Sequence, residues 1–303
     1  MSNPTSDFVS VNGIRLHYLD WGGSDPALIF LTGMGCTAYI FNDFAPRFTD
    51  RFRVLALTRR GQGDSYYPDT GYDADTLVED IRQFMDQLHI QTAVLAGHSL
   101  AGVELTHFAA TYPDRVEKLI YLDALDDRRG FAALHDLNPL KDVEPEKSDS
   151  APRSLEEYIS DSKRDMPYFA EIWSEVWEAE FTHNVKVNEE GIYVGKMPAA
   201  VAEMMTEHLI KGYAPKPVTA RIPILSFVAL GSSTLGNGYT AAQRAAWDQF
   251  ERQVRQPFAR SLAAEFQSRF PQARIVVLPD GHHYCFLVQA EQVYAEMRKF
   301  MLE

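Results

Sequence analysis

The strongest sign of chemistry in this sequence is a serine flanked by small residues. Ser99 lies in GHSLAG, between the apolar run VLA and the helix-like stretch VELTHFAATYP. Small residues at Gly97 and Ala101 let the chain turn sharply from a strand into a helix, which lifts the serine hydroxyl above the sheet as a nucleophile. A helix N-terminus there would also favour developing negative charge. A Ser-Gly turn can also occur only to cap a helix. A catalytic role for Ser99 therefore requires a base and an acid elsewhere in the chain.

The elements that must position this serine alternate between short apolar runs and amphipathic stretches. Runs that are apolar almost throughout are typical of strands in a parallel sheet covered on both faces. Apolar residues at helical spacing from Thr76 to Leu88 predict a helix between two such strands. The alternation predicts an α/β fold whose ligands bind beyond the carboxyl ends of the strands. The predicted strands are a hairpin of Phe8–Val11 and Arg15–Asp20, then Ala27–Leu31, Val54–Leu57, Ala93–Ala96 and Lys118–Leu122.

This regular order breaks after Leu125. The following residues, 126–221, are acidic, punctuated by prolines and helix-like, and strand patterns return only at Ile222–Ala229 and Ala273–Leu278. We therefore expect a core formed by residues 1–125 and 222–303, with residues 126–221 inserted as a helical lid.

Segments distributed along the whole chain resemble those of the α/β-hydrolase superfamily. LTGMG follows a predicted strand where that family keeps its oxyanion loop, usually HGxx, although Thr32 stands in place of the histidine. RRGQGDS is similar to the family's Gly-rich turn after the fourth strand, which we interpret as structural. YPDRVEKLIYLDA matches the entry into the sixth strand. The resemblance implies an α/β-hydrolase fold, a mostly parallel central sheet with helices on both faces and a helical lid inserted after the sixth strand.

The resemblance also implies an oxyanion hole beside Ser99. The backbone N–H groups of Met34 and Leu100 would hold the negative oxygen, and Gly33 would lie against the substrate. The base would come from a histidine near the C-terminus, where His282 and His283 compete.

The spacing to the last helix favours His283 over His282. The family usually starts a helix with Pro-Glu-Glu-Val seven residues after its catalytic histidine. Ala-Glu-Gln-Val at residues 290–293 fits this frame when the count begins at His283, whereas a count from His282 puts Gln289 at the proline position. His282 then becomes a loop residue.

The acid is where this sequence departs from the family pattern. The usual aspartate ends a G-x-x-D turn after the seventh strand, but the matching turn here ends in Thr234. A carboxylate is needed to fix the imidazole tautomer and to stabilise imidazolium. Asp123, at the end of the sixth predicted strand, is the favoured replacement, because haloalkane dehalogenases and some other relatives take their acid from that place. Asp126, Asp127 and a dyad without an acid are the alternatives.

Aromatic residues in the predicted lid recur at every fourth position. Phe169, Trp173, Trp177 and Phe181 would form one apolar stripe of a helix. The stripe packs the lid onto the core in the simpler interpretation. Trp173 and Trp177 could also line an apolar substrate pocket, and the two interpretations are compatible.

These residues predict a serine hydrolase that cleaves a small, fairly apolar carboxylic ester or lactone through an acyl-enzyme. Epoxide hydrolases and dehalogenases of the family use aspartate as nucleophile, so Ser99 disfavours their chemistry. C–C bond hydrolase, thioesterase, proline iminopeptidase and perhydrolase activities remain open on the same triad. A ligand receptor of the same fold, with an idle triad, is the non-enzymatic alternative.

The composition and motifs of the chain limit the partners and cofactors that we expect. A formal net charge of −13 disfavours nucleic acid, because phosphate binders concentrate Lys and Arg. Cys36 and Cys285 are far apart and predict two reduced thiols. The histidines lack metal-ligand spacing, and no dinucleotide or phosphate loop occurs, so we expect no metal and no cofactor. Without a signal peptide or an apolar run of membrane length, we expect a cytoplasmic monomer or homodimer that binds a small-molecule ester and no membrane.

Overall fold

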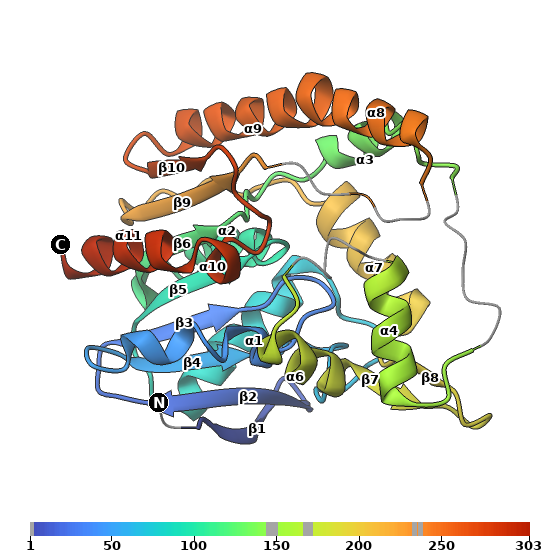
Figure 1. Ribbon diagram of the computed structural model, residues 1–303. Coiled ribbons are helices and arrows are strands. Elements are labelled where there is room, and N and C mark those ends of the chain that lie inside the picture. The colour runs from blue at the N-terminus through green and yellow to red at the C-terminus, as the bar shows by residue number, and fades with distance from the viewer. Residues whose placement is uncertain (1–2, 144–150, 166–171, 232–234, 236–238) are drawn as a thin grey trace.

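The computed structural model describes residues 3–143, 151–165, 172–231, 235 and 239–303, and its centre is one eight-stranded sheet (Figure 1). The strands follow the order β1-β2-β4-β3-β5-β6-β9-β10. β2 runs antiparallel to β1 and β4, and the other neighbours are parallel. The strands are β1 (Thr5–Val11), β2 (Ile14–Gly22), β3 (Ala27–Leu31), β4 (Arg53–Leu57), β5 (Ala93–His98), β6 (Val116–Leu122), β9 (Ile224–Ala229) and β10 (Arg274–Leu278).

The central strands are buried on both faces, which explains why their sequences are apolar without alternation. In β3, Leu28 and Phe30 pack into one core, while Ile29 and Leu31 pack into the other. Helices α1, α2 and α9 cover the face of Ile29, and α11 covers the opposite face. No helix in the described part of the chain is long and apolar enough to cross a membrane. The helices outside the region between β6 and β9 are α1 (Ala74–Gln87), α2 (Ala101–Thr111), α8 (Ala241–Phe250), α9 (Gln256–Arg269), α10 (Cys285–Val288) and α11 (Ala290–Leu302).

This architecture confirms the predicted fold class. The strands expected from apolar runs are all present, with ends that differ by up to three residues. The helix expected from Thr76 begins at Ala74 because Asp73 caps it: the Asp73 carboxylate accepts a hydrogen bond from the Thr76 N–H at 2.9 Å. All parallel strands point the same way, so the chain segments that follow β3, β5 and β6 meet at one edge of the sheet.

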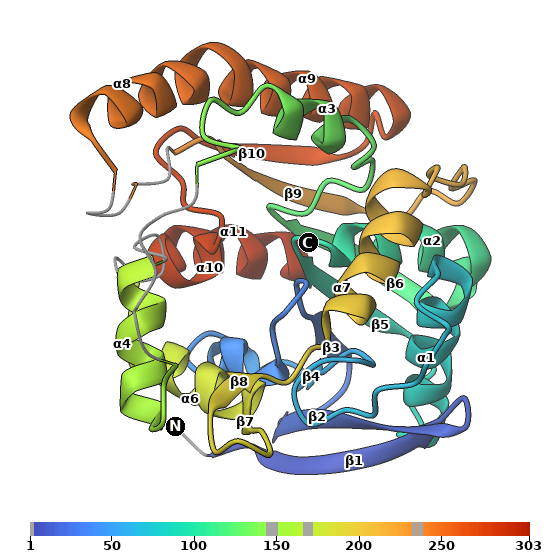
Figure 2. The same cartoon turned by 90° about the vertical axis from the view of Figure 1, so that its right-hand side faces the viewer.

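The chain between β6 and β9 carries the expected helices and, in addition, a short hairpin that the sequence did not predict. A turn at Asn188 closes the hairpin, because its side chain accepts hydrogen bonds from the N–H groups of Glu190 and Ile192 and Gly191 has a positive φ of 75°. Figures 1 and 2 show α3 beside α8 and α9, and α6 and the hairpin near β2, with α4 against α6 and β8. These elements are α3 (Gly130–Asp136), α4 (Leu155–Asp165), α6 (Glu175–Asn184), β7 (Val185–Val187), β8 (Tyr193–Gly195) and α7 (Ala199–Met205).

The sequence spacing predicted that one helix carries the aromatic stripe. In the structure, Trp173 lies outside the helix that carries Trp177 and Phe181. α6 begins at Glu175, and Ser174 before it is extended (φ −149°, ψ 175°), so Trp173 precedes the helix. Its ring still lies 4.8 Å from that of Phe181, and Trp177 lies 6.0 Å from the same ring. Phe169 lies outside the described residues. The residues therefore cluster through a bend in the chain.

Candidate active site

Ser99 occupies a strained turn between β5 and α2. Its φ of 54° lies in the left-handed region, which a residue other than glycine adopts at a cost of about 1–3 kcal/mol. Glycines make the turn possible. A Cβ on Gly97 would lie 2.9 Å from the Ala101 Cβ, and one on Gly102 would lie 1.6 Å from the Ala124 oxygen. The close packing of α2 against the end of β6 thus leaves room only for glycine and leaves Ser99 partly exposed at the sheet edge.

Asp123 lies at the end of the adjacent strand and binds His283. It also has a positive φ, 49°, and its N–H donates to the Phe227 oxygen at 3.1 Å. One carboxylate oxygen accepts from the Ala229 N–H at 2.9 Å, and the other lies 2.6 Å from His283 Nδ1. Because a carboxylate only accepts hydrogen bonds, this contact places the proton on Nδ1 and leaves Nε2 with a free lone pair.

His98, which is not among the predicted site residues, contacts the backbone and the ring of His283. Its Nε2–H donates to the His283 carbonyl at 3.1 Å, and the two ring centroids lie 4.6 Å apart. Burial lowers the pKa of His98 well below its usual value, so this ring stays neutral. Its place in the sequence, directly before Ser99, was the one available signal.

Ser99 and His283 lie at the same sheet edge, but they are not hydrogen-bonded to each other. Neither the Ser99 hydroxyl nor His283 Nε2 has a hydrogen bond to a residue within the described ranges. Such contacts in ligand-free sites are often long and tighten only when a substrate binds.

The predicted oxyanion loop lies directly against Ser99. A Cβ on Gly33 would lie 3.2 Å from the Ser99 Cβ and 2.8 Å from His98 Nδ1, so only glycine fits there. Met34 follows it, and Leu100 stands at the start of α2. Gly33 therefore lies against Ser99, and Met34 packs against the cluster that contains Leu100. The role of the Met34 and Leu100 N–H groups as an oxyanion hole stays a prediction.

A buried arginine, Arg59, links this loop to α2, the helix that follows Ser99. The Arg59 guanidinium donates to the Thr32 oxygen at 2.7 Å and pairs with Glu104 of α2, whose Oε1 lies 3.0 Å from Arg59 Nε. Both side chains of the pair are about 95% buried. RRGQGDS therefore supplies an internal clamp between the loop and α2.

The other attachment of the loop comes from α6. Glu180 accepts a hydrogen bond from the Thr37 N–H at 2.6 Å, and its second oxygen is bonded to the Thr37 hydroxyl. Asn184 donates to the Gly35 oxygen at 3.0 Å. Burial raises the pKa of Glu180 to about 8, against the opposing effect of its hydrogen bonds from Thr37 and Asn184. A neutral carboxyl group therefore joins the inserted region to the oxyanion loop near pH 7.

The competing candidates have other partners. Asp126 pairs with Arg269, whose Nη1 lies 2.8 Å from a carboxylate oxygen, and Asp127 pairs with Arg129 at 2.6 Å. The His282 Nδ1 accepts from the Tyr284 N–H at 3.0 Å. Thr234 lies outside the described residues. The structure thus brings only Asp123, among the three aspartates weighed, against a histidine of this segment.

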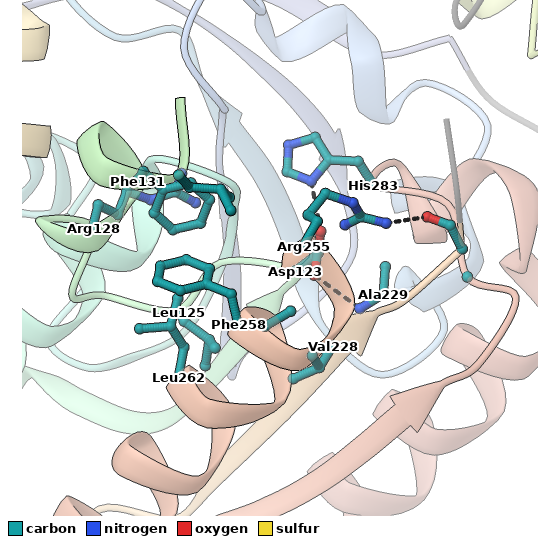
Figure 3. A pocket seen from close by; sticks show the side chains of 14 residues that line it. Asp123, Leu125, Arg128, Phe131, Val228, Ala229, Arg255, Phe258, Leu262 and His283 are labelled. Carbon is teal, nitrogen blue, oxygen red and sulfur yellow. Dashed lines mark hydrogen bonds and ion pairs between the residues drawn. The ribbon is translucent and has the colours of Figure 1, made fainter. Parts of the chain in front are cut away.

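Two cavities adjoin the site. The first, about 230 Å³, is bounded by Asp123 and His283 (Figure 3). The second, about 290 Å³, is bounded by Met34 of the oxyanion loop and Trp177 of α6. Trp173 lines neither; it faces a separate hollow beside Phe286. In the described ranges, no group of three or more His, Cys, Asp or Glu side chains is arranged to hold a metal ion.

Part of the sequence is similar to the sequences of known hydrolases. Over about a third of its length, the chain is 36% identical to 2-(acetamidomethylene)succinate hydrolase of Mesorhizobium japonicum and 34% identical, over 38%, to the soluble epoxide hydrolase of a Corynebacterium species. These matches span 36% and 40% of the relatives' own lengths. It is also 33% identical, over 38% of its length and 42% of the relative's, to a bifunctional esterase/perhydrolase of Acinetobacter calcoaceticus.

Whole-chain comparisons extend the likeness to the complete fold. The crystal structure of E-2-(acetamidomethylene)succinate hydrolase superposes with a TM-score of 0.74 at 22% identity, covering 99% of this chain and all of that one. A marine microorganism esterase superposes with a TM-score of 0.66 at 19% identity, covering 96% of this chain and all of that one. The sequence itself matches the alpha/beta hydrolase family over residues 28–296, and the chain belongs to that family.

Proposed function

We propose that this chain is a serine hydrolase that cleaves a small carboxylic ester or lactone through an acyl-enzyme. The observation that carries the proposal is the placement of Ser99 in a strained turn at the end of β5, with Asp123, the partner of His283, at the end of the adjacent strand β6. This arrangement at one edge of the sheet supports the roles of nucleophile, base and acid for Ser99, His283 and Asp123.

The geometry supports a two-step mechanism. His283 Nε2 accepts the Ser99 proton while the Ser99 oxygen attacks the carbonyl carbon, and Asp123 stabilises the resulting imidazolium without taking its proton. The N–H groups of Met34 and Leu100 hold the oxyanion. His283 then gives the proton to the leaving oxygen, and a water molecule, activated by the same ring, releases the acid.

The nucleophile favours ester cleavage over epoxide opening. Named relatives include an epoxide hydrolase and an esterase/perhydrolase, so the family likeness alone fits both. Epoxide hydrolases resembling this fold carry aspartate where this chain has Ser99. A serine elbow instead suits acyl transfer, and the adjoining loop offers backbone N–H donors for a carbonyl oxygen.

A fluorophosphonate probe and a panel of p-nitrophenyl esters test this proposal. We expect the parent protein to be labelled and to release p-nitrophenol, and Ser99→Ala to lose both, with turnover falling by up to about 10⁶-fold. Alanine fits this position, so the melting temperature should not fall. Labelling without turnover of any ester would favour a receptor, and residual activity above about a tenth of the parent would exclude Ser99 as nucleophile.

A further inference from the structure

The cavity beside His283 contains an arginine whose charge has no partner. Arg128 lines this cavity together with Asp123 and His283 (Figure 3). Its guanidinium forms no hydrogen bond or ion pair with any residue that the structure describes, and its Nε is buried without an acceptor. Its guanidinium carbon lies 5.3 Å from the centroid of the Phe131 ring.

The carboxylates around Arg128 are already engaged. Asp123 is bound by His283, Asp126 by Arg269 and Asp127 by Arg129. Burial lowers the pKa of Arg128 to about 10, while the more distant charges of Asp123 and Asp126 raise it. The group therefore stays positive at neutral pH.

Arg255, the second arginine that lines the cavity, has its charge compensated by the protein itself. Arg255 pairs with Glu251, and its Nη2 donates to the Gly231 oxygen. It thus serves to hold the chain after β9. Among the described residues, none pairs with Arg128 in this way, although the chain has 42 acidic residues against 29 lysines and arginines. Arg128 is half-buried, with its Nε buried, and a cation in such a place is stabilised when a bound ligand supplies a hydrogen-bonded negative charge.

The remaining walls of the cavity limit what that partner can be. They are apolar on the side of α3 and α9, where Phe131, Phe258 and Leu262 face the space (Figure 3). A volume of about 230 Å³ is enough for a small organic ligand. A group bound here would therefore combine a short apolar spacer with one anionic end.

We propose that Arg128 binds a carboxylate of the substrate, so that the preferred ester is apolar except for one negative group a few carbons from the scissile bond. This inference rests on the proposed serine hydrolase function and names its substrate class. Guanidinium groups bind carboxylates through paired, charge-assisted hydrogen bonds, which orient as well as hold the ligand. Bound in this way, the carboxylate would fix the distance between the cavity wall and Ser99.

Matched esters that differ only in this charge test the proposal. For the acyl side, mono-p-nitrophenyl adipate is compared with its neutral methyl ester. For the alcohol side, the pentanoate ester of 4-hydroxybenzoate is compared with that of methyl 4-hydroxybenzoate. We expect kcat/KM for the anionic member of at least one pair to exceed that of its neutral partner by about tenfold or more. The pair that shows the preference identifies which part of the substrate occupies the cavity.

Two arginine variants decide whether Arg128 causes the preference. The readout is the anionic-to-neutral ratio of kcat/KM within each variant, because a general loss of folded enzyme cancels from it. Arg128→Met should lower that ratio roughly 10- to 100-fold, mainly through KM, and Arg128→Lys should restore part of it. Arg129→Met is the matched control, because Arg129 pairs with Asp127 and does not line the cavity. Its ratio should stay at the parent value.

The outcomes separate this inference from the proposed function. Fluorophosphonate labelling of Ser99 does not depend on substrate charge, so absence of labelling would contradict the serine hydrolase itself. Labelling and ester turnover without any preference for the anionic members would overturn only the carboxylate site. A preference that Arg128→Met leaves unchanged, or that Arg129→Met removes equally, would overturn it as well.

Discussion

The two sides of this site are held in different ways. On the sheet side, backbone contacts fix the proposed catalytic residues: Ser99 and Asp123 occupy left-handed turns at strand ends, and Asp123 is bonded to the Ala229 N–H. On the lid side, which the inserted region forms, the contacts come from side chains: Glu180 and Asn184 of α6 hold the predicted oxyanion loop. We therefore expect the chemical step to depend on the sheet side. We expect the catalytic efficiency, the pH response and the substrate selectivity to depend on the inserted region.

The largest expected effect comes from the two neighbouring histidines on the sheet side. His283→Ala removes the base and should lower turnover by up to about 10⁶-fold, as losses of such groups do in related triads. His282→Ala removes a loop contact to the Tyr284 N–H and should cost less than about tenfold. Steady-state kinetics on one p-nitrophenyl ester checks both. A reversed order would show that His282 moves into the site when substrate binds.

Asp123→Asn should have the next largest effect. The amide keeps the size of the side chain, but its NH₂ group favours the wrong imidazole tautomer, so kcat should fall by about 10³- to 10⁴-fold with little change in KM. Asp127→Asn is the matched control, because Asp127 pairs with Arg129 away from His283. If Asp123→Asn left kcat within threefold of the parent, the acid would have to lie elsewhere.

The sheet side could be predicted from sequence because strand ends carry it. Apolar runs located β5 and β6, and the residues that follow them, Ser99 and Asp123, had to emerge at the same edge. The histidine required one further step, since only the spacing to α11 distinguished His283 from His282. The structure puts the former 2.6 Å from Asp123.

The lid side could not be predicted because its contacts join residues far apart in sequence. Glu180 and Thr37 are separated by 143 residues, and no local pattern marks a glutamate as buried. Arg128 lies in an ordinary charged run, Asp-Asp-Arg-Arg, in which only three-dimensional packing leaves one member unpaired. Spacing also suggested one helical stripe for Trp173 and Trp177, but the bend at Ser174 sends them to different hollows.

Replacing Glu180 tests whether the lid side controls the oxyanion loop. Glu180→Ala removes two hydrogen bonds to Thr37, and we expect kcat/KM to fall by about 10- to 100-fold as the oxyanion donors lose their fixed position. Glu178→Ala, an exposed position on the same helix, serves as the control. Equal losses in both variants would point to a general weakening of α6.

The same residue predicts a pH dependence of stability. Burial raises the pKa of Glu180 from 4.5 to about 8, so between these values the folded protein holds a proton that the unfolded chain has released. Its stabilising contribution is complete below about pH 4.5 and is lost as the pH rises through about 8. Glu180→Gln cannot ionise. Its melting temperature should therefore fall less than that of the parent between pH 6 and pH 9, and parallel curves would contradict the assigned pKa.

The smallest expected effect distinguishes the two tryptophans. Trp177 is buried, lines the cavity next to Met34, and lies 4.8 Å from the Tyr284 ring. Trp173 instead stacks under Lys163, whose Nζ lies 4.3 Å from the ring centroid, and faces the hollow by Phe286. Trp177→Ala should therefore enlarge the cavity beside the oxyanion loop and shift the preferred acyl chain of p-nitrophenyl esters by two or more carbons.

Trp173→Ala should lower the melting temperature by a few degrees, as a partly buried aromatic does, and leave the order of preference among acyl chains unchanged. Measuring kcat/KM from acetate to decanoate for both variants separates selectivity from stability, because a stability loss scales all esters alike. If Trp173→Ala changed the order and Trp177→Ala did not, the substrate would enter through the outer hollow, and the cavity at the oxyanion loop would only be packing space.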